Sequence, residues 1–288
     1  LLNLLTRKYP GMRLRQVLFP GWEQFYCPGV EQMAFTALPS SIKYGGSWLR
    51  DELRFVFTLL SCRHFTVIGA DVMDGRYDPV QILDTVKLCN LAIKSGVSVT
   101  ILGFSFSDSP NPMALAALRK LDPRVVCLCR DAVSLERFQR LTQHPAELAA
   151  DLAFNMKPKL EAPSAVKAAQ WIKEQRDNGK RIIGLNANVL TVEGTGVDIL
   201  QSYANELTKI LEGNDDIVCL MLPHDLREGQ SDYVTLKSIA ERMHQSYKDR
   251  VYLVAPAFNA WDIKALAGTL DLVIAGRMHL VIGALAGT

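Results

Sequence analysis

The chain has 288 residues, of which 49% are hydrophobic and 22% are charged, a balance typical of a soluble globular protein long enough for two domains. Its net charge of +2 gives no electrostatic reason to expect binding to nucleic acid or to another acidic partner. No apolar run reaches the roughly 18 residues that a membrane-spanning helix needs. The segment Leu1 to Leu5 also lacks the basic start and the cleavage site of a signal peptide.

The use of cysteine indicates a reducing compartment and no metal centre. The six cysteines are scattered, and most of them lie in apolar runs that are typical of buried free thiols. Cys127 and Cys129 form a C-x-C pair on a predicted strand, but no second pair of ligands accompanies them. We therefore expect no metal site.

The first half of the chain alternates predicted strands with predicted helices. A strand at 12–19 is followed by an irregular stretch from Pro20 to Trp48, rich in proline, glycine and aromatic residues, which we interpret as loop core or as a platform for a sugar. The next strands are predicted at 64–75, 97–110 and 124–129. The helices are predicted at 51–60, 79–95, 113–121 and 134–141.

The second half repeats this plan after a linker that contains Pro158 and Pro163. Its helices are predicted at 164–177, 199–212, 231–247 and 261–268. Its strands are predicted at 181–189, 216–225, 250–256 and 272–275. Strands and helices that alternate in this way predict parallel sheets with crossover helices.

The predicted fold is therefore α/β, with two Rossmann-like domains that face each other across a cleft, the arrangement called GT-B. We predict a first domain over residues 1–157 and a second over residues 158–288. The chain begins with what reads as the end of a helix and stops soon after a strand-to-helix turn. We expect both ends to be trimmed relative to a complete protein, which leaves the second domain incomplete at its C-terminal end.

Polar side chains gather at the carboxyl ends of the predicted strands, which is where open α/β sheets bind ligands. In the first half they include Asp71, Asp74, Ser105, Arg130, Asp131 and Ser134. In the second half they are Asn186, Asn188, His224, Asp225, Arg277 and His279. An Asp or Ser at such a turn is most simply a helix cap, as we interpret Ser134. Two arginines and two histidines, spread over both halves at equivalent ends, favour a functional site.

Six segments follow one another in a characteristic order: GADVMDGRY, GFSFSDSP, CRDAVSLERF, AADLAF, LPHD and AGRMHLVIGALAG. This series resembles the polysaccharide pyruvyl transferase family from about Phe65 to the C-terminus. The resemblance implies a GT-B-like fold and the transfer of the enolpyruvyl skeleton of phosphoenolpyruvate onto two sugar hydroxyls as a ketal, with release of phosphate. The chain departs from the family in its G-A-D segment, where a G-G-G cluster is usual, and in lacking the family's G-N-x-G-D-type segment.

The resemblance also implies roles for the polar residues. Phosphoenolpyruvate carries a carboxylate and a phosphate, so we expect Arg130 and Arg277 to bind it as fixed cations. His279 is the expected general acid, and His224 is a second acid–base group or a phosphate contact. The further expected substrate-binding residues are Asp71, Ser105, Asn186 and Asp225, of which Asp225 is equally open to a capping role.

The expected partners follow from the same resemblance. The donor substrate is phosphoenolpyruvate, and no further cofactor is expected. The acceptor is a sugar or a lipid-linked oligosaccharide of a cell-surface polysaccharide or exopolysaccharide, and a lipid-linked acceptor would bring the protein to the membrane periphery. We expect a cytoplasmic protein, while the acceptor sugar and the oligomeric state are not specified by the sequence.

Two other classes of protein stay open at this point. The first is a nucleotide-sugar glycosyltransferase of the GT-B fold, in which an acidic residue on the donor ribose would follow the end of this chain. The second is a non-catalytic carbohydrate-binding relative. Titration with UDP-sugars and with phosphoenolpyruvate distinguishes the first class from a pyruvyl transferase, and replacement of Arg130 and Arg277 distinguishes the second.

Overall fold

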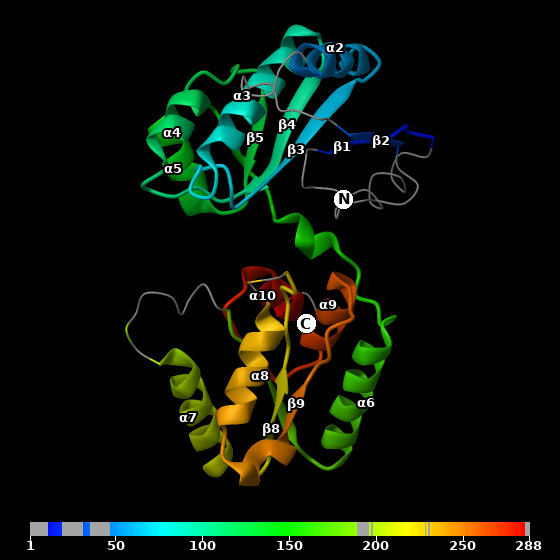
Figure 1. Ribbon diagram of the computed structural model, residues 1–288, viewed down its shortest axis with the longest axis vertical. Coiled ribbons are helices and arrows are strands. Elements are labelled where there is room, and N and C mark those ends of the chain that lie inside the picture. The colour runs from blue at the N-terminus through cyan, green and yellow to red at the C-terminus, as the bar shows by residue number, and fades with distance from the viewer. Residues whose placement is uncertain are drawn as a thin grey trace. The chain divides into compact units, whose positions relative to one another are not determined.

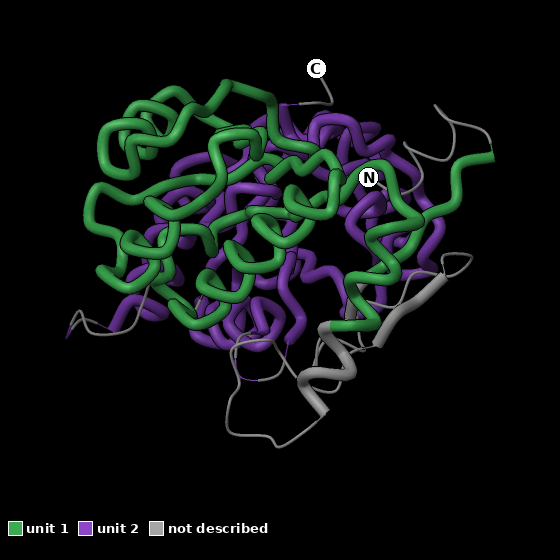
Figure 2. Tube along the Cα trace, turned by 90° about the horizontal axis from the view of Figure 1, so that it is seen from above, with its two compact units in different colours: residues 1–152 green, residues 153–288 purple. Residues whose placement is uncertain are grey.

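The computed structural model divides the chain into two compact units, Leu1–Leu152 and Ala153–Thr288 (Figure 2). The residues that the structure describes are 11–18, 31–34, 47–188, 196, 198–227, 229 and 231–285. Each unit has its own parallel sheet of four strands and its own helices (Figure 1). Each is therefore Rossmann-like, as the alternating pattern predicts.

The chain leaves the first unit at a short 3₁₀ helix, η3 (Leu152–Asn155). Just before it, Asp151 accepts a hydrogen bond from Arg130 Nη1 at 3.2 Å within the first unit. Just after it begins, Lys264 Nζ donates to the carbonyls of Ala153 at 2.8 Å and Phe154 at 3.1 Å within the second unit. These contacts explain why the second unit begins at residue 153, whereas the proline-containing linker had suggested a boundary at 157–158.

The first sheet has the strand order β3-β4-β5-β6, with every pair parallel. These strands are β3 (His64–Ala70), β4 (Ser98–Phe104), β5 (Val126–Cys129) and β6 (Glu147–Leu148). A separate two-stranded parallel sheet pairs β1 (Arg15–Leu18) with β2 (Glu31–Ala34). The prediction of an irregular stretch from Pro20 to Trp48 is wrong for β2, because the segment EQMA forms a strand only through its pairing with β1. Trp22, Phe25 and Tyr26 lie outside the described residues.

The described helices of the first unit are α2 (Ser47–Leu59), α3 (Pro79–Lys94), α4 (Pro112–Leu118) and α5 (Ala132–Thr142). Three of these four helices, α3, α4 and α5, start where the sequence supplies a capping side chain. Asp78 Oδ1 accepts from the backbone N of Val80 at 2.9 Å and so caps α3, and Asn111 caps α4 in the same way. A proline at the first position follows each of these two caps, where its missing N–H is no loss.

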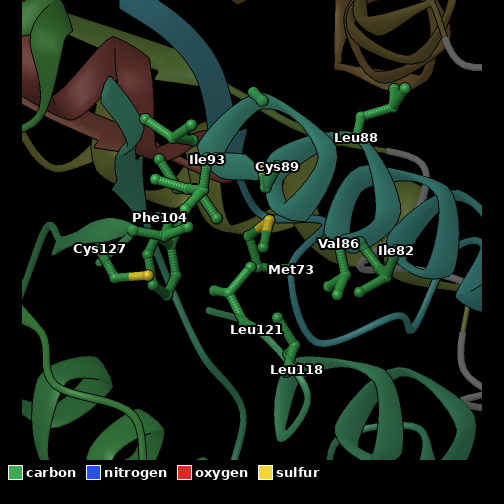
Figure 3. Close-up of a cluster of buried hydrophobic side chains, with 14 of the residues drawn as sticks. Met73, Ile82, Val86, Leu88, Cys89, Ile93, Phe104, Leu118, Leu121 and Cys127 are labelled. Atoms are coloured by element: carbon green, nitrogen blue, oxygen red, sulfur yellow. The ribbon is translucent and has the colours of Figure 1, made fainter. Parts of the chain in front are cut away.

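The core of the first unit lies on one face of its sheet (Figure 3). Phe104 and Cys127 meet the buried side of α3 there, because alternate residues of a strand point to the same face. A Cβ atom on Gly69 would lie 2.7 Å from Phe104 Cβ, so glycine lets β3 approach β4 closely. On the opposite face Ile68 is 61% exposed and Val126 is 42% exposed. Among the described residues this sheet is therefore well covered on one face.

The second sheet has the strand order β10-β7-β8-β9, again entirely parallel. Its strands are β7 (Arg181–Asn186), β8 (Ile217–Met221), β9 (Val251–Leu253) and β10 (Leu272–Ala275). Its helices are α6 (Pro163–Asp177), α7 (Ile199–Glu212), α8 (Asp232–Arg242), α9 (Ala260–Ala267) and α10 (Met278–Leu285), with the 3₁₀ helix η5 (Gln245–Arg250). The single helix predicted at 231–247 is wrong beyond Arg242, because Met243 is extended and buries its side chain in the core.

Helices cover both faces of the second sheet. Ile182 and Leu220 point into a core shared with α6, α9 and α10, while their neighbours Ile183 and Met221 point into a second core shared with α7 and α8. Strand side chains alternate between faces, so two adjacent apolar residues imply burial on both sides. The second unit is therefore a doubly wound α/β domain, with helices on each side of its strands (Figure 1).

A buried carboxylate joins α9 to the start of α6. Asp262 is fully buried, and its Oδ1 accepts from the backbone N of Glu161 at 2.6 Å and of Ala162 at 3.1 Å. Its Oδ2 accepts from the backbone N of Asn259 at 2.9 Å, which closes a capping box on α9. One side chain thus satisfies three backbone donors from two segments of the chain.

Replacing Asp262 with alanine is expected to lower the free energy of unfolding by roughly 2–4 kcal/mol, because three buried backbone donors lose their acceptor. Urea denaturation followed by circular dichroism measures this loss. The matched control is Asp216→Ala, which removes an exposed carboxylate paired with Arg181 at 2.7 Å and should leave the midpoint nearly unchanged. Equal midpoints for the two variants would contradict the role assigned to Asp262.

The described cysteines are mostly buried free thiols, as the sequence predicts. Cys89, Cys127, Cys129 and Cys219 are buried, and burial raises the pKa of Cys89 and of Cys219 to about 12. Cys62 is only partly buried, and Cys27 lies outside the described residues. No helix in the described part of the chain is both long enough and apolar enough to cross a bilayer.

Candidate functional site

The strand order of the second sheet switches sides at β7, its first strand in the sequence. The chain lays β8 and β9 in turn on one side of β7 and then returns to place β10 on the other side. Beyond the carboxyl ends of β7 and β10, Gly276 N donates to Asn186 O at 3.2 Å. Open α/β sheets bind ligands at such a switch in strand order, beyond the carboxyl ends of the strands. The predicted polar residues of the second unit follow these strand ends.

Asp232, the first residue of α8, connects the ends of three strands. Its Oδ2 accepts from Nδ2 of Asn186, the last residue of β7, at 3.0 Å, and from the backbone N of His224 at 3.1 Å and of Asp225 at 3.0 Å after β8. Its Oδ1 accepts from Arg277 Nη2 after β10 at 2.8 Å. Asp232 is fully buried, so these donors replace the water that a carboxylate otherwise requires.

Arg277 is held between two carboxylates. Besides Asp232, its Nη2 lies 3.4 Å from Asp225 Oδ2. Asp225 is itself paired with Arg227, whose Nη2 lies 2.6 Å from Asp225 Oδ2, and hydrogen bonds from Arg227 are the main reason that the pKa of Asp225 lies below its usual value. Two arginines and two aspartates thus form a cluster whose formal charges cancel.

His224 and His279 stack on each other at this end of the sheet. Their ring centroids are 6.3 Å apart, and their planes differ by 13°. His224 is partly buried after β8, whereas His279 is exposed in the first turn of α10. The pKa of His224 lies below its usual value, first because burial disfavours the imidazolium and next because His279 repels a second positive charge. Burial and the neighbouring His279 thus favour the neutral form of His224, which suits it to accept a proton.

The lowered pKa of His224 predicts a loss of stability in acid. In the unfolded chain a histidine binds its proton near pH 6.5, so between this value and the lower pKa in the folded protein the unfolded chain binds more protons. Stability should therefore fall as the pH decreases through about 6.5. Urea midpoints at several pH values measure this fall, and His224→Gln should show a smaller one than the wild type. The same fall in both proteins would contradict the prediction.

Asn186 lies deeper than a substrate contact requires. Its side chain is fully buried, and Nδ2 donates to Leu222 O at 2.9 Å as well as to Asp232. Its Oδ1 is buried and has no hydrogen-bond partner in the described part of the protein. The structure thus places Asn186 beneath the site, where it supports Asp232. Its predicted role in substrate binding stays a prediction.

Arg130 is the centre of a polar network in the first unit. Its side chain is only 5% exposed and contacts two carboxylates, Asp71 and Asp151. Its Nε donates to Ser105 Oγ at 2.7 Å, and its Nη1 donates to Asp151 at 3.2 Å. Asp71 follows Ala70, a non-glycine residue at a φ of 44° in the left-handed region, so the chain turns sharply where β3 ends. Three predicted residues, Asp71, Ser105 and Arg130, are thus in direct contact.

Ser134 and Asp131 stabilise the start of α5. Asp131 Oδ1 accepts from Ser134 N at 2.7 Å and is the cap of the helix, while Ser134 Oγ donates to Asp131 Oδ2 at 2.7 Å. Ser134 Oγ also accepts from Phe106 N at 2.9 Å. The prediction that Ser134 caps this helix is wrong, because Asp131 is the cap and Ser134 lies in the first turn of α5. Ser134 instead connects α5 to the segment that follows β4.

The predicted residues form two groups, one in each unit. Asp71, Ser105 and Arg130 share contacts in the first unit, and Asn186, His224, Asp225, Arg277 and His279 gather at one end of the sheet in the second. The predicted joint binding of one ligand by Arg130 and Arg277 stays a prediction. The sequence did not identify Asp232 as a site residue, and it did not identify Asp151 as a partner of Arg130. An acidic residue shortly after the LPHD segment was the available signal for Asp232.

The described residues contain no group of three or more histidine, cysteine or acidic side chains arranged to hold a metal ion. The polar groups of the second unit instead offer a fixed guanidinium, two imidazoles and backbone N–H groups at the start of α10. The N-terminus of a helix favours negative charge. The arrangement suits an anionic ligand and proton transfer close to it.

Several solved structures have a similar fold. A putative UDP-N-acetylglucosamine 2-epimerase from Listeria monocytogenes is 12% identical with a TM-score of 0.47, and the match covers 89% of this chain and 62% of that one. The Anabaena protein HepE, solved with UDP and glucose, is 11% identical with a TM-score of 0.50, covering 85% of this chain and 60% of its own. This chain therefore spans less than two thirds of either protein.

A third similar structure is that of S. aureus MnaA with UDP, which is 11% identical with a TM-score of 0.50. The match covers 96% of this chain and 78% of that one. At such identities the similarity bears on the fold alone. No curated protein sequence matches this chain at a significant level.

Two Rossmann-like units with polar residues at their strand ends define an α/β protein of the GT-B-like class. Its family follows from the sequence model of the polysaccharide pyruvyl transferases, which matches residues 5–286, nearly the whole chain. The chain belongs to the polysaccharide pyruvyl transferase family.

Proposed function

We propose that this protein transfers the pyruvyl group of phosphoenolpyruvate onto two hydroxyls of a sugar in a cell-surface polysaccharide or exopolysaccharide, forming a ketal and releasing phosphate. Membership of the family supports transfer to a sugar acceptor. The observation that carries the proposal is the stacked pair His224 and His279 beside Arg277. This group combines a fixed cation with two imidazoles of unequal burial.

The reaction needs two kinds of proton transfer. Addition of a proton to the methylene carbon of phosphoenolpyruvate forms a methyl group and leaves a positive centre at the carbon that bears the phosphate. One sugar hydroxyl adds to this carbon and loses its proton. The carbon–oxygen bond to phosphate then breaks, and the second hydroxyl adds and loses its proton. The sum is one ketal and one hydrogen phosphate ion, with no oxidant or reductant required.

The two histidines suit the two kinds of transfer. His279 is exposed at the start of α10, and in this proposal it delivers the proton to the methylene carbon. His224 is partly buried and favours its neutral form, so it receives the proton of the sugar hydroxyl or contacts phosphate. Arg277 binds the carboxylate or the phosphate of the donor, and Asp225 orients the sugar or His224. In the first unit, Arg130 together with Asp71 and Ser105 contributes to substrate binding.

The proposal includes the expected partners and location. The acceptor is a sugar or a lipid-linked oligosaccharide, which would place a cytoplasmic protein at the surface of a membrane. No cofactor takes part, because the chemistry is acid–base transfer on the donor substrate. No nucleic acid takes part.

Release of inorganic phosphate from phosphoenolpyruvate, screened over a panel of sugar acceptors, tests the proposed function. We expect phosphate release that depends on both an acceptor and the protein, together with a product heavier by the mass of a pyruvyl ketal. Calorimetric titration with UDP-sugars is the complementary measurement. Tight binding of a UDP-sugar without binding of phosphoenolpyruvate would overturn the proposal in favour of a nucleotide-sugar glycosyltransferase.

A further inference from the structure

We propose that Asp232 is a positioning residue that sets both the geometry and the anion affinity of this site. The inference rests on the proposed function and names a residue that the sequence pattern did not single out. Asp232 is fully buried, and its side chain accepts hydrogen bonds from the last residue of β7 and from residues that follow β8 and β10. Nothing in this arrangement requires Asp232 to touch the substrate.

The hydrogen bonds at Asp232 require a carboxylate and exclude its amide. Its Oδ2 faces the N–H groups of His224 and Asp225 and the Nδ2 of Asn186, while its Oδ1 faces Arg277. All of these are donors. An asparagine has one acceptor oxygen, so its own N–H₂ group would face donors on the other side. The carboxylate therefore holds four donor residues in one geometry.

Asp232 also closes the turn that carries His224. Its backbone N donates to Asp225 O at 2.8 Å, while its carboxylate accepts from the backbone N of Asp225. The segment from Asp225 to Asp232 is thus fixed at both ends by the same two residues. The backbone N–H of His224 also donates to the Asp232 carboxylate. Asp232 therefore fixes the backbone from which the His224 side chain projects. The stacked geometry with His279 depends on it.

Asp232 and Asp225 also place negative charge beside Arg277. The fully buried Asp232 lies 2.8 Å from Arg277 Nη2, and Asp225 lies 3.4 Å from the same atom. Two carboxylates at this range reduce the attraction that Arg277 exerts on an anion. The site therefore binds its anion less tightly than the guanidinium alone would allow. In return, Arg277 has a fixed orientation, which favours turnover and product release over tight binding.

The experiment compares Asp232→Asn with the wild type in the full chain, using inorganic phosphate as the probe in calorimetry and phosphate release from phosphoenolpyruvate as the rate. We expect Asp232→Asn to bind phosphate roughly fivefold to tenfold more tightly, because one negative charge beside Arg277 is gone. High salt should reduce this difference. Turnover should fall at least about tenfold, because the common anchor of Arg277 and the 224–225 turn is lost.

If Asp232 only stabilised the fold, Asp232→Asn would weaken phosphate binding and reduce turnover together. A folded Asp232→Asn that binds phosphate as the wild type does, or less tightly, overturns the inference. The matched control is Asp216→Asn, which makes the same chemical change just before β8, at the opposite end of the strand, beside Arg181. We expect neither its phosphate affinity nor its turnover to change.

Asp225→Asn serves as a second variant if Asp232→Asn does not fold. It removes the other carboxylate beside Arg277, and we expect a tightening of phosphate binding of roughly twofold to threefold, because that carboxylate lies farther away and is already paired with Arg227. No tightening in a folded Asp225→Asn would overturn the charge argument. If the wild-type protein does not bind phosphate, the proposed function fails. If the wild-type protein binds phosphate and releases it from phosphoenolpyruvate, but neither variant binds phosphate more tightly, only the inference about Asp232 fails.

Discussion

Replacing His279 with glutamine is expected to reduce phosphate release from phosphoenolpyruvate by about 10²–10⁴-fold, the range that a positioned general acid contributes. Glutamine keeps a polar side chain of similar length but has no proton to give at neutral pH. His279 is exposed in the first turn of α10, so the change should leave the core intact. Steady-state rates with a saturating acceptor measure the loss, and the KM for phosphoenolpyruvate should change far less than kcat.

His244→Gln is the matched control for this prediction. His244 is also exposed and lies in the second unit, where its Nδ1 accepts from Ser246 N at 3.3 Å and caps η5. We expect it to retain wild-type turnover. His224→Gln should reduce turnover as well, because it removes the other member of the stacked pair. Wild-type turnover in His279→Gln would rule out His279 as the proton donor and would transfer that role to another group.

Elements with strong local signals were predictable from the sequence alone. The helices predicted to begin at residues 79 and 113 are α3, which starts at Pro79, and α4, which starts at Pro112. The apolar run Leu272–Ala275 is β10 over the same four residues. These signals act within a few residues of the chain, so no knowledge of the tertiary fold is needed to read them.

The role of Asp232 could not be predicted in this way. Read locally, an acidic residue at the start of a helix is an ordinary first-turn residue that favours the helix dipole. Its hydrogen-bond partners come together because β10 is added beside β7, so that Arg277, which follows β10, and Asn186, in β7, both reach Asp232. Strand order is a property of the whole domain. The residues expected at the site were identified from their positions at strand ends, but the carboxylate that joins them was not.

Arg130 presents the same difficulty in the first unit. Its position after β5 predicted an anion-binding residue, whereas the structure surrounds it with Asp71, Asp151 and Ser105. Asp151 belongs to the AADLAF segment, whose function the sequence did not reveal. Its contact with Arg130 gives that segment a structural role, because it fixes the chain just before it leaves the first unit.

Replacing Arg130 with methionine is expected to lower the free energy of unfolding of the first unit by roughly 3–5 kcal/mol, the usual cost of removing one partner from a buried ion pair. Asp151 is only 11% exposed on its side chain and loses the guanidinium that it contacts, whereas Asp71 is 53% exposed and regains water. Hydrogen exchange at the amides of β4 and β5 measures the loss within this unit. Arg181→Met, which removes an exposed partner of Asp216, should leave exchange nearly unchanged.

The conservative variant Arg130→Lys separates this structural role from the proposed role in substrate binding. Lysine keeps the positive charge but has one nitrogen, so it cannot contact Asp71, Asp151 and Ser105 as the guanidinium does. If Arg130 serves the framework alone, Arg130→Lys should lose stability while the KM for phosphoenolpyruvate stays at the wild-type value. If Arg130 also binds the donor, the KM should rise about tenfold or more, because a bidentate contact with carboxylate or phosphate is lost. If Arg130→Lys keeps both the wild-type protection of the β4 and β5 amides from exchange and the wild-type KM, both roles are contradicted. Neither the stability of the first unit nor donor binding would then depend on the guanidinium.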